Sequence, residues 1–323
     1  MSLLVTGANG HVGSTVVRTA AAAGMDVIAL VRSPDRAEGL LEAGSGRVRL
    51  VACELGDPFE IAAALAGHRP RACIHTAAVP NDRLAKPHPW RAIATNVTAT
   101  AALLELARRQ GWERFVHVST GSVFQTERDF TRALAEDHPT AAHTTYGATK
   151  LCSEHLVRMY RHDFGLSAAV VRISFVYGPP LVPRFRDLPR GPVVALLREA
   201  ILGEPIREPS GGDFQASFTY IEDVAAGLVA AATAADLRHD VYHLGNGRNW
   251  TTFEVAAAIR AAVPGAVVEV GPGTEPWTTY NTMRGPLSGS RLRDDAGFEA
   301  AFPLERGVAA FAEWMRRHRE RLT

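Results

Sequence analysis

The sequence predicts an α/β protein built on a doubly wound parallel sheet, with a smaller and mainly helical part at its C-terminal end. Two observations carry this prediction. Through the first half of the 323 residues, short runs rich in Val and Ile alternate with Ala-rich segments of helical length. A glycine-rich turn directly follows the first of these runs. Strands that are separated by helices pair in parallel, and helices then cover both faces of the sheet.

The elements of the first part follow this rhythm. Strands are expected at residues 3–5, 27–31, 48–52, 72–75, 115–119 and 168–173. Helices are expected between them at residues 14–23, 36–43, 59–66, 90–109 and 146–164. Gly24 is placed to end the first helix. We therefore assign residues 1–176 to one Rossmann-type domain.

The chain changes character after Tyr177. Residues 178–192 are rich in proline and arginine, which is typical of a loop. Helices are expected beyond it at residues 193–202, 224–233, 253–262 and 304–319, and strands at 217–221 and 241–244. We expect the pieces around 217–245 to return to the first sheet. Residues 177–323 are expected to form the part that binds the substrate.

Composition argues against several classes of protein. Lys and Arg number 35 against 34 Asp and Glu, and this balance is not that of a nucleic-acid or membrane-surface binder. No apolar run approaches the roughly 18 residues of a membrane span, and no export signal precedes the first strand. The cysteines Cys53, Cys73 and Cys152 lack zinc-ligand spacing and suggest unpaired thiols in a reducing cytoplasm. We expect a cytoplasmic protein without a metal site.

Residues 4–13 read LVTGANGHVG, with Gly7, Gly10 and Gly13 at equal spacing. Glycine lets a strand turn directly into a helix, and the N–H groups at the start of that helix suit a pyrophosphate. We expect Gly7 to make the turn, Gly10 to admit the phosphates and Gly13 to let helix and strand pack closely. A tight turn without a ligand is the alternative, because a glycine triplet alone is a weak signal.

The end of the second strand bears on the choice of cofactor. Val31 is followed by Arg32, and the nearest carboxylate, Asp35, lies in the turn beyond. A carboxylate at this place binds the ribose 2′-hydroxyl of NAD, whereas an arginine accommodates the 2′-phosphate of NADP. The sequence therefore favours NADP over NAD. A solvated surface arginine is the alternative for Arg32.

A tyrosine and a lysine, Tyr146 and Lys150, stand four residues apart and therefore on one face of an expected helix. A phenol loses its proton near pH 10, and a neighbouring ammonium group lowers that pKa, so Tyr146 would act as a general acid or base. The strand FVHVS ends at Ser119 and Thr120, at the edge where parallel sheets place ligands. A hydroxyl there would hold the substrate oxygen. A chance tyrosine–lysine pair on a helix is the alternative.

Together these motifs resemble the extended short-chain dehydrogenase/reductase family, also called the NAD-dependent epimerase/dehydratase family. TGANGHVG is similar to its TGxxGxxG turn, HTAA at 75–78 to HxAA, and TNVTAT at 95–100 to its NVxGT helix. STGSVF at 119–124 is similar to SSxxVYG, YGATK to YxxxK, VRISFVYGPP to RxxNxYGP and SFTYIEDVA to DFxYVDDVA. The resemblance covers nearly the whole chain. It implies hydride transfer to or from a bound nicotinamide, with Tyr146 as acid/base.

The resemblance also assigns residues to the site. Its catalytic set would be Tyr146, Lys150 at the cofactor ribose, Thr120 at the substrate oxygen and Asn96 in support. The positions expected at the cofactor are Gly7, Asn9, Gly10, His11, Val12, Gly13, Arg32, Glu54, Leu55, Thr76, Ala77, Ala78, Asn96, Ser119, Tyr146, Lys150, Ile173 and Val176. The positions expected at the substrate are Val79, Thr120, Gly121, Ser122, Tyr146, Ser174, Phe175 and Arg184. We expect His75 to pack near the cofactor edge, and Asp57 either to cap the next helix or to reach the adenine.

Departures from the family pattern concern the substrate. Phe175 stands where nucleotide-sugar enzymes of the family usually carry an Asn that contacts the substrate phosphate. Gly121 and Ser122 follow Thr120, where the sugar dehydratases carry Asp-Glu, so a dehydratase is not expected. The arginines of the loop either grip an anionic substrate or are solvated: Arg184, Arg186 and Arg190.

We therefore expect an NADP- or NAD-dependent carbonyl reductase or alcohol dehydrogenase for a small, anionic or polyhydroxylated molecule. The alternative is an NAD-dependent nucleotide-sugar epimerase, in which the hydride returns to the opposite face. A third and different reading is a non-catalytic protein that senses NAD(P). Net change of the cofactor separates the first two, and an unchanged activity of Tyr146→Phe would favour the third. A homodimer is expected from the resemblance.

Overall fold

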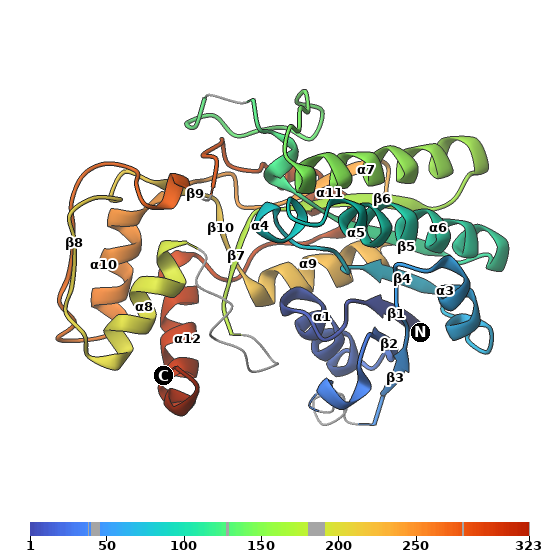
Figure 1. Ribbon diagram of the computed structural model, residues 1–323, viewed down its shortest axis with the longest axis horizontal. Helices are drawn as coiled ribbons and strands as arrows, with labels where there is room; N and C mark the ends of the chain where they lie inside the picture. The colour runs from blue at the N-terminus through green and yellow to red at the C-terminus, as the bar shows by residue number, and fades with distance from the viewer. Residues whose placement is uncertain (38, 40–45, 127–128, 180–190, 280, 323) are drawn as a thin grey trace.

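Two parts lie side by side in the chain: a layered part with a sheet between helices, and a smaller part built from α8, α10, α12 and short strands (Figure 1). The structure is a computed structural model that describes residues 1–37, 39, 46–126, 129–179, 191–279 and 281–322. Within these ranges, no helix is both long and apolar enough to cross a membrane.

Seven strands of the described chain form one parallel sheet in the order β11-β6-β5-β4-β1-β2-β3, which confirms the predicted doubly wound fold. Leu3 pairs with Val27 on one side and with Ala72 on the other, so the strand order reverses beside β1. Ligands of such sheets bind at this reversal, outside the carboxyl ends of the strands. The strands are β1 (Ser2–Thr6), β2 (Asp26–Val31), β3 (Val48–Ala52), β4 (Ala72–His75), β5 (Arg114–Thr120), β6 (Ala168–Ile173) and β11 (Val241–Leu244).

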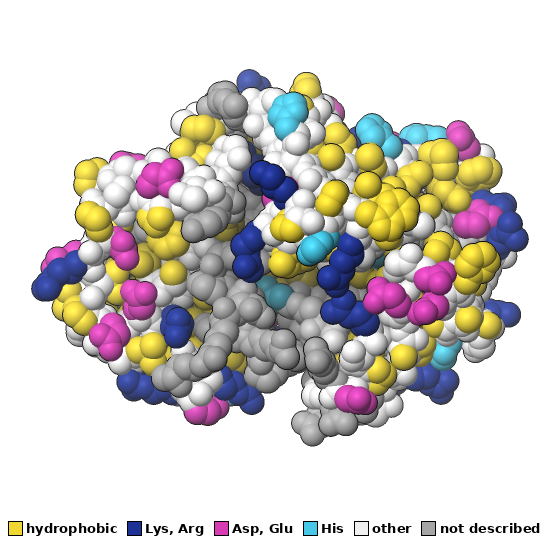
Figure 2. Space-filling view, in the orientation of Figure 1, with side chains coloured by type: hydrophobic (Ala, Val, Ile, Leu, Met, Phe, Trp, Pro, Cys, Tyr) yellow, Lys and Arg dark blue, Asp and Glu magenta, His cyan; other side chains and the backbone are white. Residues whose placement is uncertain are grey.

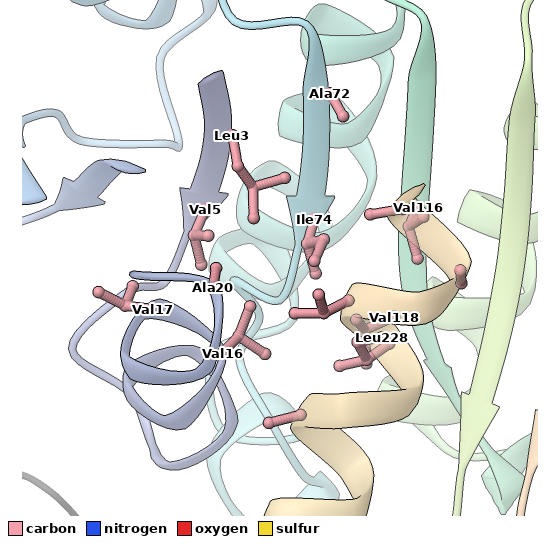
Figure 3. Packing of buried hydrophobic residues seen from close by; sticks show 14 of the residues in the cluster. Leu3, Val5, Val16, Val17, Ala20, Ala72, Ile74, Val116, Val118 and Leu228 are labelled. Atoms are coloured by element: carbon pink, nitrogen blue, oxygen red, sulfur yellow. The ribbon is translucent and has the colours of Figure 1, made fainter. Parts of the chain in front are cut away.

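Helices cover both faces of this sheet. One face carries α1 (His11–Ala22) and α9 (Ile221–Thr233), and α11 (Ser290–Ala296) lies beside α9 and β11. The other face carries α3 (Pro58–Leu65), α6 (Ala99–Gln110) and α7 (Thr145–Phe164). Figure 3 shows Val16 of α1 and Leu228 of α9 against Val5 and Ile74 of the sheet, and all four are fully buried. Each such side chain contributes about 1.5–3 kcal/mol of hydrophobic stabilisation.

The C-terminal part has a core of its own. Leu197, Ile259 and Phe311 are buried in it, one from each of three helices. These helices are α8 (Pro192–Leu202), α10 (Thr252–Ala262) and α12 (Leu304–Arg317). Short strand pairs complete the part: β8 (Ile206–Glu208) with β13 (Val268–Val270), β9 (Gln215–Ala216) with β12 (Trp250–Thr251), and β7 (Phe175–Tyr177) with β10 (Phe218–Tyr220).

The structure differs from the sequence expectations in several elements. The helix expected at 90–109 is broken into α5 (Pro89–Ile93), a π-helical segment (Ala94–Thr98) and α6. A 3₁₀ turn (Pro34–Arg36) lies at the start of the expected helix 36–43, most of whose residues lie outside the described chain. The short helix α4 (Asp82–Ala85) was not expected. Helix α1 begins at His11 rather than at residue 14, which brings its N-terminus into the glycine turn.

Three histidines are buried in the sheet and stay neutral: His75, His117 and His243. Burial, together with the nearby charge of Lys150, lowers the pKa of His75 to about 3. Burial also holds the pKa of His117 well below its usual value, with Lys150 and His75 acting in the same direction. The unfolded chain protonates these groups near pH 6.5 but the native chain does not, so the free energy of unfolding falls as the pH drops below 6.5.

His117→Leu tests this acid sensitivity. Neither ring nitrogen of His117 has a hydrogen-bond partner among the described residues, so leucine removes a buried polar group that has no partner. We expect the variant to gain about 2 kcal/mol more stability at pH 5 than at pH 7.5, relative to wild type. Urea unfolding at both pH values measures this. Exposed His155→Leu is the control, and an equal effect of His117→Leu at both pH values would contradict the account.

Candidate active site

The glycine turn between β1 and α1 is tightly packed where two of its glycines lie. Gly7 has φ +61°, and a Cβ on it would lie 2.7 Å from the Cα of Ala77. A Cβ on Gly13 would lie 2.2 Å from the carbonyl oxygen of Gly7 and 2.8 Å from Oγ1 of Thr76. Side chains at these two positions are therefore excluded by backbone, which agrees with the expected turn and close packing.

The N-terminus of α1 suits a phosphate group. Ser14 N–H donates the first helical hydrogen bond to the carbonyl of Gly10, so the amides of residues 11–13 have no acceptor within the helix. Gly10 is exposed, and a Cβ on it would meet only the Gly7 carbonyl, at 3.1 Å. No acidic residue lies in the first turn. These features fit the pyrophosphate of a dinucleotide.

The ends of β1 and β4 are joined beside the turn. Thr6 Oγ1 lies 2.7 Å from His75 Nδ1 and accepts from the Ala77 amide at 3.2 Å, while Thr76 Oγ1 donates to the Thr6 carbonyl at 2.7 Å. His75 is fully buried and its Nε2 lies 3.0 Å from Thr100 Oγ1. The histidine therefore fixes the strand ends. Asn9, Val12 and Ala78 are half-buried around the turn, and the ring of His11 bonds to the Gly178 carbonyl at 3.1 Å.

Residues beyond β2 and β3 have mixed surroundings. Arg32 is exposed directly after β2, which ends at Val31. The next carboxylate along the chain, Asp35, lies in the 3₁₀ turn beyond it. Leu55 is buried in the core between the sheet and α3, whereas Glu54 is exposed and accepts from the Gly56 amide at 3.4 Å. Asp57 accepts from the Phe59 amide at 2.8 Å and caps α3, which supports the capping alternative for this residue.

Helix α7 brings the tyrosine and lysine to the carboxyl end of β5. Thr120 is the last residue of β5, and Tyr146 and Lys150 lie in the first turns of α7. A Cβ on Gly147 would lie only 2.9 Å from the Ser122 carbonyl, so a glycine here lets the helix approach the turn after Thr120. Thr120 Oγ1 accepts from the Ser122 amide at 3.1 Å, and its own proton remains available to a substrate oxygen.

Lys150 is 2% exposed, and this burial lowers its pKa to about 7, although Glu154 acts in the opposite direction. Glu154 is held by Arg172, with Nη2 to Oε2 at 2.6 Å and Nε to Oε1 at 2.9 Å. Ser119 Oγ donates to the same carboxylate at 2.5 Å. The buried Ser119 hydroxyl thus supports Glu154, and of the expected pair only Thr120 presents its hydroxyl at the strand end.

Asn96 lies in the π-helical segment and bonds both to α7 and to the chain after β4. Its Oδ1 accepts from the Val79 amide at 2.7 Å, and its Nδ2 donates to Thr149 Oγ1 at 2.9 Å. Its carbonyl accepts from Thr100 at 2.6 Å and from Ser153 at 2.7 Å. The helix widens here, and these side-chain hydroxyls satisfy the carbonyl. Asn96 therefore fixes the helix that carries Tyr146 and Lys150.

The substrate-side residues are only partly brought together. Ser122 lies against Gly147, the residue after Tyr146, and Gly121 precedes it in the same turn. Ile173, Ser174 and Val176 are half-buried between the end of β6 and β7. The ring of Phe175 packs edge-on against Phe214 and Phe218, at 6.1 and 5.6 Å between centroids. Arg184, Arg186 and Arg190 lie outside the described residues.

Sequence reasoning missed the supporting charges. Glu154 stands four residues beyond Lys150 on the same helix, a spacing that pointed to it. Arg284 carried no such signal, yet its side chain lies against Gly121. Figure 2 shows several Lys and Arg side chains on this face of the molecule, near the middle where its two parts meet, which suits an anionic ligand.

Comparison with known proteins gives consistent matches. The family model of the NAD dependent epimerase/dehydratase family matches residues 3–245. The UDP-glucose 4-epimerase of Mycolicibacterium smegmatis is 31% identical over 322 residues, covering 98% of this chain and 99% of that one. A dTDP-glucose 4,6-dehydratase of Xanthomonas campestris is 28% identical over 331 residues, covering 96% and 92%. The structure of Thermus thermophilus UDP-glucose 4-epimerase in complex with NAD superimposes with a TM-score of 0.81 at 26% identity, covering 98% and 100%.

Proposed function

Because this chain belongs to the NAD-dependent epimerase/dehydratase family, we propose that it inverts a secondary alcohol of a sugar-type substrate, with Tyr146 as acid/base. The chain is an NAD(P)-dependent enzyme of the extended short-chain dehydrogenase type. Its relatives support the epimerase alternative better than the carbonyl reductase or alcohol dehydrogenase that the sequence favoured. The observation that carries the proposal is the meeting of Thr120 and α7 beside the phosphate-binding turn.

The residues of the chain would divide the work as follows. A bound nicotinamide dinucleotide would supply the hydride acceptor and donor. The Thr120 hydroxyl would hold the substrate oxygen. Tyr146 would take the proton of the substrate hydroxyl and later return it. A protonated Lys150 would stabilise the Tyr146 phenolate by its charge. The N-terminus of α1 would hold the pyrophosphate, and residues 177–323 would close over the substrate.

A dehydratase reaction has little support despite the dehydratase relatives. Elimination of water needs a second acid and base, and the pair after Thr120 is Gly121-Ser122, which supplies neither. The guanidinium of Arg284 lies against Gly121 in their place. The proposal is therefore restricted to reactions that move a hydride and one proton.

A cofactor balance tests the proposed function. The purified enzyme is incubated with UDP-glucose and substoichiometric NADP, with NAD in a parallel reaction, while the absorbance at about 340 nm and the sugar product are followed. An epimeric UDP-sugar that accumulates at constant absorbance supports the proposal. Reduced cofactor that accumulates in step with the product would instead make the enzyme a net dehydrogenase.

Net oxidoreduction is the second candidate because of Phe175. Its ring is committed to the aromatic cluster with Phe214 and Phe218 and donates no hydrogen bond where family members hold a nucleotide-sugar phosphate. This favours a smaller substrate, and the same cofactor balance, run with carbonyl compounds, is the screen for it.

We also propose from the resemblance that the protein is a homodimer. Light scattering, which measures the mass of the particle in solution, is the test.

Arg32 is expected to decide the cofactor. We predict that NADPH binds at least tenfold tighter than NADH, which is about 1.4 kcal/mol, because the exposed Arg32 guanidinium would pair with the 2′-phosphate. Arg32→Ala should remove the difference, while Arg49→Ala, another exposed arginine on β3, should keep it. Fluorescence titration measures both. Equal or tighter binding of NADH to the wild type would show that this arginine is merely solvated.

A further inference from the structure

One arginine of the C-terminal part reaches the turn that follows the catalytic threonine. A Cβ on Gly121 would lie 3.2 Å from Nη1 and 3.4 Å from Cδ of Arg284. The guanidinium also lies close enough to Tyr146 for the two charges to interact. Arg284 therefore fills the room that a side chain at position 121 would occupy, next to Thr120.

The backbone that carries Arg284 is firmly held. The Asn249 side chain donates to the Arg284 carbonyl at 2.8 Å and to the Phe130 carbonyl at 3.1 Å. A Cβ on Gly285 would lie 2.3 Å from the Arg132 carbonyl, so this segment packs directly on residues 129–134. The next residue, Pro286, accepts from the Leu134 amide at 2.7 Å. The side chain is thus presented from a fixed position.

The guanidinium has few partners for its donors. Nη2 donates to the Thr282 carbonyl at 3.0 Å, whereas Nε is buried without an acceptor among the described residues. No described carboxylate forms an ion pair with it, unlike the buried Arg172, which grips Glu154 with two hydrogen bonds. Burial lowers the pKa of Arg284 to about 10, so it remains charged at neutral pH. A half-buried guanidinium with unused donors favours an anionic partner.

The surrounding charges favour an anion as well. Lys150 follows Tyr146 by one turn of α7, and the carboxylate of Glu154 is already paired with Arg172 and Ser119. Gly121-Ser122 contributes no negative charge after Thr120. Asp82 brings one carboxylate to the start of α7, where its Oδ1 accepts from the Tyr146 amide at 3.2 Å. Beside Gly121, the charge of Arg284 is not paired with a carboxylate of the described chain and favours an anion.

We propose that Arg284 binds a carboxylate that the substrate carries next to its reacting carbon. Gly121 has no side chain and so leaves room for the side chain of Arg284 there. The proposal rests on the proposed function and narrows its substrate to sugar acids. A planar guanidinium holds a carboxylate through two parallel hydrogen bonds, a geometry that a lysine ammonium does not offer. Arg284 would be a specificity residue, because it contacts the substituent and leaves the reacting oxygen to Tyr146 and Thr120.

Calorimetric titration with UDP-glucuronic acid and UDP-glucose tests this proposal. Both probes share the nucleotide and differ in the carboxylate beside C4. We expect the wild type to bind the acid at least tenfold tighter. Arg284→Gln should lose that tenfold while binding UDP-glucose within twofold of wild type, and Arg284→Lys should recover only part of it. The exposed Arg293→Gln is the control, and thermal unfolding of each variant checks its fold.

The outcomes separate this inference from the proposed function. If Arg284→Gln removes the preference for the acid but neither probe is epimerised, the inference stands and the proposed function fails. If epimerisation occurs while the wild type binds both probes equally, the inference is overturned alone. Equal weakening of both probes in Arg284→Gln also overturns it, because Arg284 would then bind the part that they share. Failure of both probes to bind overturns it too.

Discussion

Tyr146→Phe is expected to lower kcat by about 10²- to 10⁴-fold, because it removes the group that moves the substrate proton. Tyr146 lies in the first turn of α7, which approaches the Ser122 carbonyl through Gly147 and so faces the end of β5. The substitution deletes one oxygen atom and leaves the packing of the ring unchanged. Cofactor binding should therefore stay within a few-fold of wild type, and the loss should lie in kcat.

Tyr160→Phe is the matched control for this prediction. Tyr160 lies on the same helix, and its hydroxyl donates to Glu105 at 3.2 Å, away from the end of β5. Its loss should change the rate less than twofold. Steady-state kinetics of both variants, with cofactor titrations alongside, make the comparison. A Tyr146→Phe enzyme as active as Tyr160→Phe would remove Tyr146 from the mechanism and would favour the non-catalytic alternative.

Gly13→Ala is expected to have the largest effect on the nucleotide-binding turn. The added Cβ would lie 2.2 Å from the Gly7 carbonyl oxygen, and backbone must move to relieve this contact. Overpacking of this kind costs about 1–3 kcal/mol. The movement also displaces the amides at the start of α1, so we expect cofactor binding to fall below detection.

Gly67→Ala shows whether the effect of Gly13→Ala belongs to this position. No atom lies within 4 Å of a Cβ at Gly67, and its φ is not positive, so alanine is accommodated there. Urea unfolding and NADPH titration of the two variants measure stability and affinity separately. Normal cofactor binding by Gly13→Ala would mean that the turn tolerates a shift, and that the close packing seen here is not needed for the site.

Much of the sheet followed from the sequence because burial on both faces forces a readable pattern. The runs at 27–31 and 168–173 are continuous Val- and Ile-rich segments, as strands covered on both sides must be. Of the pieces around 217–245 that were expected to return to this sheet, 241–244 joins its edge as β11, whereas 218–220 (β10) pairs with β7 outside it. The short strands β9 and β13 were not predicted, because a run of two or three residues is too short to show the alternation of apolar and polar residues that marks a strand.

The break in the helix expected at 90–109 had no local cause that a sequence displays. The π-helical segment is matched by two hydrogen bonds with α7: the Asn96 side chain donates to Thr149, and Ser153 donates to the Asn96 carbonyl. These partners meet only after the fold forms. The resemblance pointed to Asn96 as a supporting residue, but no spacing rule could give the bonds it makes. Tertiary contacts decided the local geometry here.

In the candidate site, too, some residues could be predicted from the sequence and others could not. Tyr146 and Lys150 were proposed from their spacing on one helix, and the pair Ser119 and Thr120 from its place at a strand end. The resemblance singled out Thr120 of that pair. Ser119 was expected at the cofactor, yet its hydroxyl bonds to Glu154, because alternate residues of β5 face opposite sides. Arg284 could not be anticipated, since it meets Gly121 through the packing of the C-terminal part on the first.

The central claim is that a hydride leaves a carbon of the substrate and returns to the same carbon. The most direct test is a turnover of UDP-glucuronic acid and, in parallel, of UDP-glucose, each deuterated at C4, with unlabelled cofactor, followed by mass and NMR analysis of the product. The account predicts an epimerised UDP-sugar that keeps its deuterium at C4 and a cofactor without net reduction. Deuterium released into free reduced cofactor or into water would contradict it.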